Sequence, residues 1–245
     1  MLLTEFDDNR QAIINPEDLN EPLEGFPKIA VSCFSRSTFQ RMLEMFPHEL
    51  IYETSMANVA IPIYKLVIDE QELALFNAPV GASACVAILE DIFALGTDKL
   101  VLFGTCGVLD EDIKETSIII PSHALRDEGT SFHYVEASNE IAVNVGVLDR
   151  FRSYLNERQI SHKEGKVWTT DGIYRETNGK LKARKAAGAI CVDMECSAVA
   201  ALAKFRGVEI CHFFYGIHNI IGSRLFQLTF IYMGIWLNLQ KFHHI

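Results

Sequence analysis

The sequence lacks the cysteine patterns of a disulfide-stabilised or zinc-binding protein. Its six cysteines are scattered through apolar stretches and form neither a CxxC pair nor a combination with histidine at zinc-ligand spacing. The absence of these spacing patterns argues against a secreted disulfide framework and against a structural zinc site. We therefore expect mostly buried, reduced thiols, no metal site and a cytoplasmic protein. The cysteines are Cys33, Cys85, Cys106, Cys191, Cys196 and Cys211.

Basic residues are scarce as well. Lys and Arg total 22 against 32 Asp and Glu, which gives a formal charge of −10 and a pI near 5.3. A protein that holds nucleic acid by its phosphates needs clustered Lys and Arg. The composition thus argues against a nucleic-acid partner and favours small-molecule substrates.

The chain shows no secretory signal and no apolar run long enough for a membrane span. Glu5 and Asp7 fall within the first seven residues, and no long apolar core follows them. The apolar run at 225–239 is short and is interrupted by Gln227 and Asn238, so a buried helix or strand is the simpler interpretation. We expect no membrane partner.

Acidic residues are missing altogether from residues 216–245, although the preceding part holds all 32 of them. This change of character divides the chain into an irregular N-terminal arm (1–27, with Pro16, Pro22 and Pro27), a main domain (28–215) and an atypical apolar tail (216–245). A reading-frame change near Gly216 would explain the shift. Sequencing the gene past that codon tests this hypothesis, and an intact frame that matches close relatives would refute it.

The main domain alternates between strand-like and helix-like apolar patterns. A length of 245 residues with 49% hydrophobic content suits one large domain. The rhythm of strand, turn, helix and strand predicts a single α/β domain with a central mixed, largely parallel sheet flanked by helices, and ligand sites at the carboxyl ends of the strands. The expected strands are 28–32, 72–78, 100–103, 116–120, 166–170 and 208–215, and the expected helices are 39–46, 84–95, 144–156 and 180–187.

Residues 189–208 carry the clearest local signal. A short β-branched run passes into apolar residues at helical spacing, which indicates a strand turning into a helix. Asp193 and Glu195 would then sit in the first helical turn, where the helix dipole stabilises carboxylates. Glu195 could present an acceptor to a neutral polyol, but both acids could also be simple helix caps. The apolar face consists of Met194, Ala198, Leu202 and Phe205.

A glycine-rich run follows the strand expected at 100–103. Gly104 and Gly107 would let backbone N–H groups approach an anion, and the Thr105 hydroxyl would add a donor. The run could equally be a plain tight turn. Arg36, which follows the first expected strand, could reach the same anion or could be a solvated arginine at a helix start.

Four segments in order resemble the nucleoside phosphorylase family, which includes hexameric-type purine nucleoside phosphorylases, uridine phosphorylases and related nucleosidases. Residues 103–107 are similar to its phosphate and sugar loop, 168–171 to its base-site strand end, and 192–195 to its ribose-binding segment. Residues 126–133 resemble a segment of the uridine-phosphorylase branch. The resemblance implies cleavage of an N-glycosidic bond by phosphate, which yields a free base and (deoxy)ribose 1-phosphate.

The resemblance also implies roles for the matched residues. Asp171 would protonate a purine base, which requires a raised pKa that partial burial at a strand end would promote. Glu195 would hold the ribose hydroxyls and Met194 would pack against the sugar. Phosphate would be a co-substrate with no cofactor, in a dimer-based homo-oligomer or hexamer whose arm contacts a neighbouring subunit. The implied sites are catalytic Asp171; ribose-binding Asp193, Met194 and Glu195; phosphate-binding Arg36, Gly104 and Thr105; and base or sugar residues Cys106, Gly107, His133 and Thr170.

Two arginines that the resemblance implies are missing. Leu102 stands two residues before the first loop glycine, where phosphorylases of the family carry an arginine, and no arginine occurs between Arg41 and Arg126. A phosphate dianion needs charge-assisted donors. Hydrolysis by water and a non-catalytic nucleoside-binding role therefore stay open. Thr177 and Gly179 stand near the positions of the uracil-reading pair of the uridine branch, so the base is also undecided.

Overall fold

All strands that the structure describes belong to one mixed sheet, with β5 (Lys99–Val108) at its centre. The structure is a computed structural model that describes residues 2–110, 112–113 and 118–216. The other strands are β1 (Ile29–Cys33), β2 (His48–Met56), β3 (Val59–Ile68), β4 (Gln71–Asn77), β6 (Ile118–Asp127), β7 (Glu140–Ala142), β8 (His162–Thr170), β9 (Ala189–Asp193) and β10 (Glu209–Gly216). The helices are α1 (Pro16–Leu19), α2 (Arg36–Met45), α3 (Ala82–Leu95), α4 (Leu148–Glu157), α5 (Asn178–Ala186) and α6 (Cys196–Arg206), with 3-10 turns η1 (Leu2–Thr4), η2 (Thr130–His133) and η3 (Ile173–Arg175).

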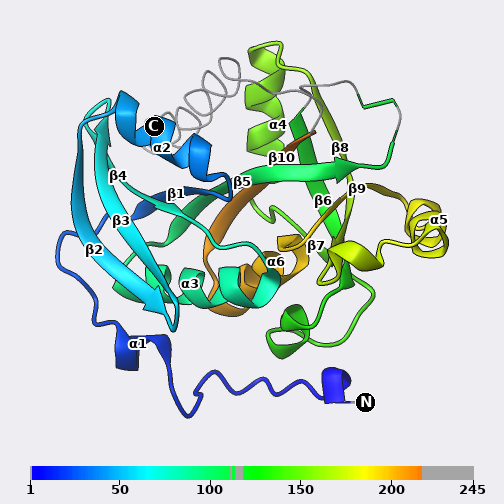
Figure 1. Cartoon of the computed structure of the whole chain (residues 1–245), viewed down its shortest axis with the longest axis horizontal. Helices are drawn as coiled ribbons and strands as arrows, with labels where there is room; N and C mark the ends of the chain where they lie inside the picture. The colour runs from blue at the N-terminus through cyan, green and yellow to red at the C-terminus, as the bar shows by residue number, and fades with distance from the viewer. Residues whose placement is uncertain (1, 111, 114–117, 217–245) are drawn as a thin grey trace.

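Strand β5 joins an open part of the sheet to a closed part. It runs parallel to β1 and to β10, and its last residues, Gly107 and Val108, pair antiparallel with β9. Because β10 also pairs with β6, and β6 continues through β8 to β9, these pairings close into a ring. On the other side the sheet continues through β1 and β4 to the antiparallel strands β3 and β2 (Figure 1).

Helices cover both faces of the sheet. Alternate residues of β1 show the two layers, since Ile29 and Val31 pack with α2 and α4, whereas Ala30 packs with α3 and α6. This alternation is the period of two expected of a strand that is buried on both faces. The predicted single-domain α/β fold with helices flanking a mixed sheet is confirmed.

Several element boundaries differ from the sequence predictions. Helix α4 begins at Leu148 rather than 144, because Asn144 and Gly146 have φ angles of 55° and 82° that an α-helix cannot contain. Strands β2 and β3 were not predicted, because the mostly exposed or half-buried residues of β2 give no clear apolar pattern and Pro62 interrupts the otherwise apolar run of β3. The start of the strand expected at 116–120 and the tail from 217 onwards lie outside the described residues.

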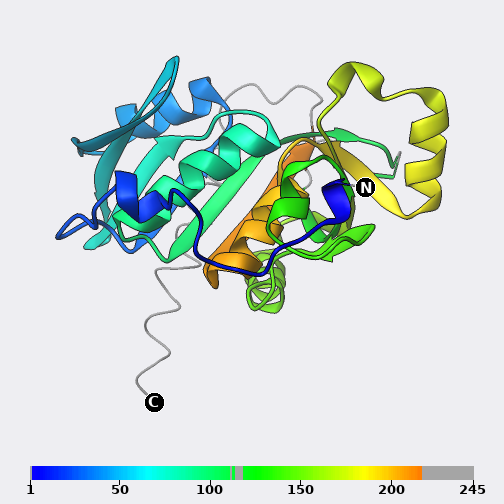
Figure 2. The same cartoon turned by 90° about the horizontal axis from the view of Figure 1, so that it is seen from below.

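The N-terminal segment crosses the surface of its own chain. Residues 2–27 run beside α3 and α6 and reach η2, and the two perpendicular views agree on this path (Figures 1 and 2). Its last part is fastened to α3, where the Asn20 side chain donates to Asp91 at 2.8 Å and the Leu23 amide donates to the carbonyl of Leu95 at 3.1 Å. This segment therefore forms part of the surface beside α3 and η2.

Two composition-based features can be read from the described residues. All six cysteines are free and buried, so the expectation of buried thiols is confirmed. None of the described helices combines the length and the apolar character that crossing a membrane requires.

Candidate active site

The junction between β9 and α6 holds the two acids of the 189–208 stretch. Strand β9 ends at Asp193, and α6 begins at Cys196. One Asp193 oxygen accepts from the backbone amides of Glu195 (3.0 Å) and Cys196 (2.6 Å), and the other accepts from the Thr169 hydroxyl at 2.7 Å. The predicted first-turn position is thus wrong for both acids. Asp193 precedes the helix and satisfies its first free amides, as a capping residue does.

Glu195 occupies the N-cap position of α6, but its side chain turns away from that helix. Its carboxylate accepts from the backbone amide of Gly81 at 2.6 Å, at the start of α3. Glu195 is only 5% exposed. Burial, reinforced by the charge of Asp193, raises the pKa of Glu195 to about 8. The result is a buried acceptor fixed between two helix N-termini.

A third buried acid, Glu128, joins this cluster. It accepts from the Ser197 hydroxyl at 2.8 Å and from the Ser131 amide at 2.9 Å. Burial raises the pKa of Asp193 to about 6, and the negative charge of Glu128 adds to the effect. Sequence reasoning missed Glu128, although it lies in the recognised 126–133 segment. Among the described residues, no group of three or more His, Cys, Asp or Glu is arranged to hold a metal ion.

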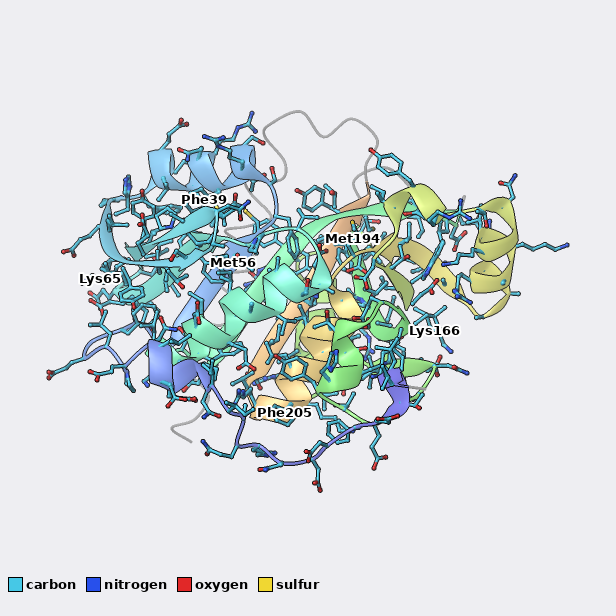
Figure 3. All side chains as sticks on the ribbon, turned by 60° about the horizontal axis from the view of Figure 1, so that its bottom comes forward. Phe39, Met56, Lys65, Lys166, Met194 and Phe205 are labelled. Carbon is cyan, nitrogen blue, oxygen red and sulfur yellow. The ribbon has the colours of Figure 1, made fainter. Side chains whose placement is uncertain are left out.

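A cleft of ≈980 Å³ opens beside these acids. We call it the carboxyl-edge cleft because Met194 and Asp171, which follow β9 and β8, line it together with Gly81 and Ala82 at the start of α3. From there the lining continues past His133 of η2 and along α3 to Asp91, reaches Phe205 and Arg206 at the C-terminal end of α6, and includes residues of the N-terminal segment between Asp7 and Leu19. In Figure 3 Met194 lies near the centre of the molecule, and Phe205, at the other end of α6, lies beside the N-terminal segment.

The base-site residues take different positions in this cleft. Asp171 lines it but is exposed, so the expected partial burial is wrong; its carboxylate accepts from the Gly129 amide at 2.9 Å. His133 also lines the cleft and is exposed. Thr170 is buried, and its hydroxyl accepts from the Gly172 amide at 3.2 Å, so it shapes the turn after β8.

Residues 104–107 form the end of β5, so the predicted loop is wrong. The glycines permit close packing: a Cβ on Gly104 would lie 2.6 Å from the Phe34 ring, and one on Gly107 would lie 2.8 Å from a methyl of Val192. Cys106 points into the core with Cys191, whereas Thr105 is exposed. The glycine signal was read as a turn, although it marks close approach of side chains.

The implied phosphate residues lie apart from the residues that line the cleft. Arg36 begins α2, is exposed, and has no carboxylate partner among the described residues. Cys33 and Phe103 are register partners in β1 and β5, so Arg36 and Thr105 follow neighbouring strands at the same edge of the sheet. Neither residue lines the carboxyl-edge cleft. Of the implied base and ribose residues, the structure thus brings Met194, Asp171 and His133 to one cleft, with Arg36 and Thr105 on a separate part of that edge.

Neither Leu102 nor Arg126 offers a free cation to a phosphate. Leu102 is 0% exposed and packs in the core under α3 and α6. Arg126 is 7% exposed and donates to the Ser131 and Ser138 hydroxyls, at 2.8 and 2.9 Å, and to the carbonyl of Glu136 at 2.7 Å. Its guanidinium is therefore used to shape the loop after β6.

Comparison with known proteins identifies the family. The family model described as the phosphorylase superfamily matches residues 28–224. The chain belongs to the phosphorylase superfamily. This confirms the resemblance to the nucleoside phosphorylase family, and the match continues past residue 215 into the first part of the acid-free tail.

Curated members of this superfamily align with part of the chain. A guanosine phosphorylase of Halorubrum lacusprofundi is 22% identical over 149 residues, which cover 60% of this chain and 62% of that protein. A purine nucleoside phosphorylase of the DeoD type from Brevibacillus brevis is 30% identical over 111 residues, or 44% and 46% of the two chains. The chain thus matches about half to three fifths of the length of these relatives.

Solved structures of the superfamily share the fold over most of the chain. Uridine phosphorylase from Vibrio fischeri superimposes with a TM-score of 0.72 at 17% identity and covers 92% of both chains. Purine nucleoside phosphorylase from Toxoplasma gondii, in complex with immucillin-H, gives a TM-score of 0.69 at 19% identity and covers 86% of this chain and 85% of its own. At these identities the likeness concerns the fold.

Proposed function

We propose that this phosphorylase-superfamily chain cleaves the N-glycosidic bond of a purine nucleoside or of uridine, with phosphate as the second substrate. The products would be a free base and (deoxy)ribose 1-phosphate. The observation that carries the proposal is the placement of Glu195, a buried carboxylate held by the Gly81 amide directly beside two residues that line the carboxyl-edge cleft.

The reaction needs a held sugar, a stabilised leaving base and a nucleophile near C1′. Glu195 can accept hydrogen bonds from ribose hydroxyls, because a carboxylate takes more hydrogen bonds than the one that Gly81 donates. Met194, half-buried in the cleft wall, offers an apolar surface to the sugar. Asp171, which follows β8 and lines the cleft, would face the base.

Phosphate would bind at the part of the carboxyl edge that holds Arg36 and Thr105. A dianion there lacks two charge-assisted partners, each worth about 1.5–3 kcal/mol. Its affinity should therefore fall by about two to four orders of magnitude, to a dissociation constant in roughly the tens of millimolar. Calorimetry of phosphate into the protein tests this, and a constant well below a millimolar would show that other groups replace the arginines.

A second candidate function is hydrolysis of the same bond by water. The burial of Leu102 in the core favours it, because the position that would carry the phosphate arginine faces apolar side chains. A third candidate is nucleoside binding without catalysis, in which Glu195 would still hold the sugar but no base would be released.

One assay separates the three functions. The full chain is incubated with inosine, adenosine or uridine, with and without phosphate, and base release is followed by chromatography. Release that depends on phosphate supports phosphorolysis, and release that is indifferent to it supports hydrolysis. Measurable nucleoside binding without release supports the binding role. Loss of release in Glu195→Gln ties the signal to this protein.

We also propose that the enzyme works without a cofactor, in the cytoplasm, as a homo-oligomer. The exposed apolar side chains Ile13, Ile14 and Leu19 in the N-terminal segment support assembly, since such groups gain by burial against a second subunit. Light scattering on the purified protein measures the subunit number, and a monomer at all concentrations would contradict this proposal.

A further inference from the structure

A second cavity lies on another side of α6. It has a volume of ≈390 Å³ and shares no lining residue with the carboxyl-edge cleft. Its walls come from β7 and the loop after it, from α6, from the turn between α6 and β10, and from β10 itself. Most of the lining is apolar and includes Ile141, Val143, Val199, Ala200, Ala203 and Ile210. We call this space the α6 cavity.

His212 of β10 supplies an unpaired polar group to the α6 cavity. The residue is 1% exposed, and neither ring nitrogen has a hydrogen-bond partner among the described residues. Burial lowers the pKa of His212 to about 3, so the ring is neutral near pH 7. A neutral imidazole has one N–H donor and one acceptor nitrogen, and buried polar groups of this kind are normally satisfied.

The other polar side chains that line the α6 cavity either have hydrogen-bond partners already or are exposed to solvent. The Asn144 amide donates to the carbonyls of Pro121 (3.0 Å) and His212 (2.9 Å) and accepts from the His212 amide at 2.7 Å. These bonds replace ladder bonds where β10, which pairs with β6 at Phe214 and Tyr215, has separated from that strand. Lys204 is exposed, and no carboxylate lines the cavity. The His212 ring is therefore the polar feature available to a ligand.

We propose that the α6 cavity binds a small uncharged molecule with an apolar ring system and one hydroxyl group. A hydroxyl can donate a hydrogen bond to the acceptor nitrogen of a neutral imidazole. Charged ligands fit poorly, since burying a charge without a counter-charge is unfavourable. An apolar cavity of about 150 Å³ binds benzene, so the α6 cavity has room for two fused rings. The proposal is independent of the catalytic one, because its readout is binding.

Calorimetry with 2-naphthol on the full chain tests the proposal. The matched ligand is 2-methoxynaphthalene, which can accept a hydrogen bond but cannot donate one. We expect 2-naphthol to bind about tenfold more tightly, as one hydrogen bond of about 1.4 kcal/mol would give. The absence of 2-naphthol binding up to its solubility limit would overturn the proposal.

Two variants, with one control, test whether the naphthol binds in the α6 cavity. Ala203→Phe fills it and should abolish binding of both ligands, whereas Ala186→Phe on the exposed face of α5 should leave binding unchanged. His212→Phe keeps a ring of similar size without nitrogens and should reduce the tenfold preference to about one. Undiminished binding in Ala203→Phe, or an unchanged preference in His212→Phe, would contradict the assignment. Thermal unfolding checks both folds, and His212→Phe carries the test if Ala203→Phe does not fold.

Discussion

The proposed ribose side and the proposed phosphate side of the carboxyl edge are built differently. On the ribose side, Asp193, Glu195 and Glu128 are buried, and each is held by hydrogen bonds from backbone amides or hydroxyls. On the phosphate side, Arg36 and Thr105 are exposed. The hydrogen bonds fix the three buried acids before any ligand binds, whereas the charge of Arg36 lies in solvent.

Apolar packing takes the place of charge on the phosphate side. The Phe34 ring lies directly against Gly104, and Leu102 is in the core beneath α3 and α6. A preorganised polar site is worth more than the same groups held loosely in water. The contrast implies that changes on the ribose side act on turnover, whereas changes at Leu102 act on stability.

The largest expected effect is that of Leu102→Arg. A guanidinium at this fully buried position would lie among apolar side chains with no counter-charge. A buried charge without a counter-charge costs about 3–5 kcal/mol of stability. An arginine at this position should therefore unfold the protein rather than recover phosphate binding. Urea unfolding measures the loss.

Two variants control for the size and the charge of this substitution. Leu102→Met keeps the volume and should cost less than about 1.5 kcal/mol. Thr105→Arg places the same charge at an exposed position of the same strand and should be tolerated. If Leu102→Arg is as stable as the parent and binds phosphate in the millimolar range, the two sides are not as different as the structure indicates.

Glu195→Gln should give the next largest effect. The amide can still accept from Gly81, so the fold should persist, but above about pH 8, where Glu195 is ionised, a charged acceptor for sugar hydroxyls is lost. A charge-assisted hydrogen bond is worth about 1.5–3 kcal/mol, or about one to two orders of magnitude in kcat/KM. Glu49→Gln on the exposed surface of β2 is the matched control. Equal turnover in Glu195→Gln and the parent would remove Glu195 from the proposed mechanism.

The strand-to-helix change at 189–208 was predicted correctly, whereas the positions of its two acids were not, for a physical reason. The strand-to-helix change at 189–208 is local, because hydrophobic periodicity switches within a few residues. The contact between Glu195 and Gly81 joins residues 114 positions apart and depends on how α3 and α6 meet. Spacing along the chain cannot show it.

The glycines of β5 show a second limit. Gly104 and Gly107 suggested a loop, because glycine is common in turns. Here each leaves room for a neighbouring side chain, Phe34 or Val192, whose position depends on the packing of other strands. Strict alternation from Phe103 would have placed Cys106 on the other face from Thr105, and that part of the pattern was readable in the sequence.

The raised pKa of Glu195 predicts that the free energy of unfolding depends on pH. A carboxyl whose pKa is raised on folding contributes stability that is complete below its usual value near 4.5 and is lost as the pH rises through about 8. The free energy of unfolding should therefore fall by roughly 1–2 kcal/mol between about pH 6 and pH 8. Glu195→Gln should remove this fall in stability, whereas Glu49→Gln should leave it unchanged. A parent stability that rises over the same interval would contradict the burial of a neutral Glu195.

The smallest expected effect is selective and concerns Asp171. Its carboxylate accepts from the Gly129 amide, and an asparagine side-chain oxygen can do the same, so Asp171→Asn should leave the fold unchanged. A purine offers the ring nitrogen N7 for an interaction with Asp171, whereas uridine has no such nitrogen. We therefore expect kcat/KM for inosine to fall about tenfold more than that for uridine, a difference of about 1.4 kcal/mol in transition-state stabilisation. Asp98→Asn, outside the lining of the cleft, is the control. Equal losses on inosine and uridine would make Asp171 a residue that positions the loop at Gly129, and the ribose-side acids alone would then carry the chemistry.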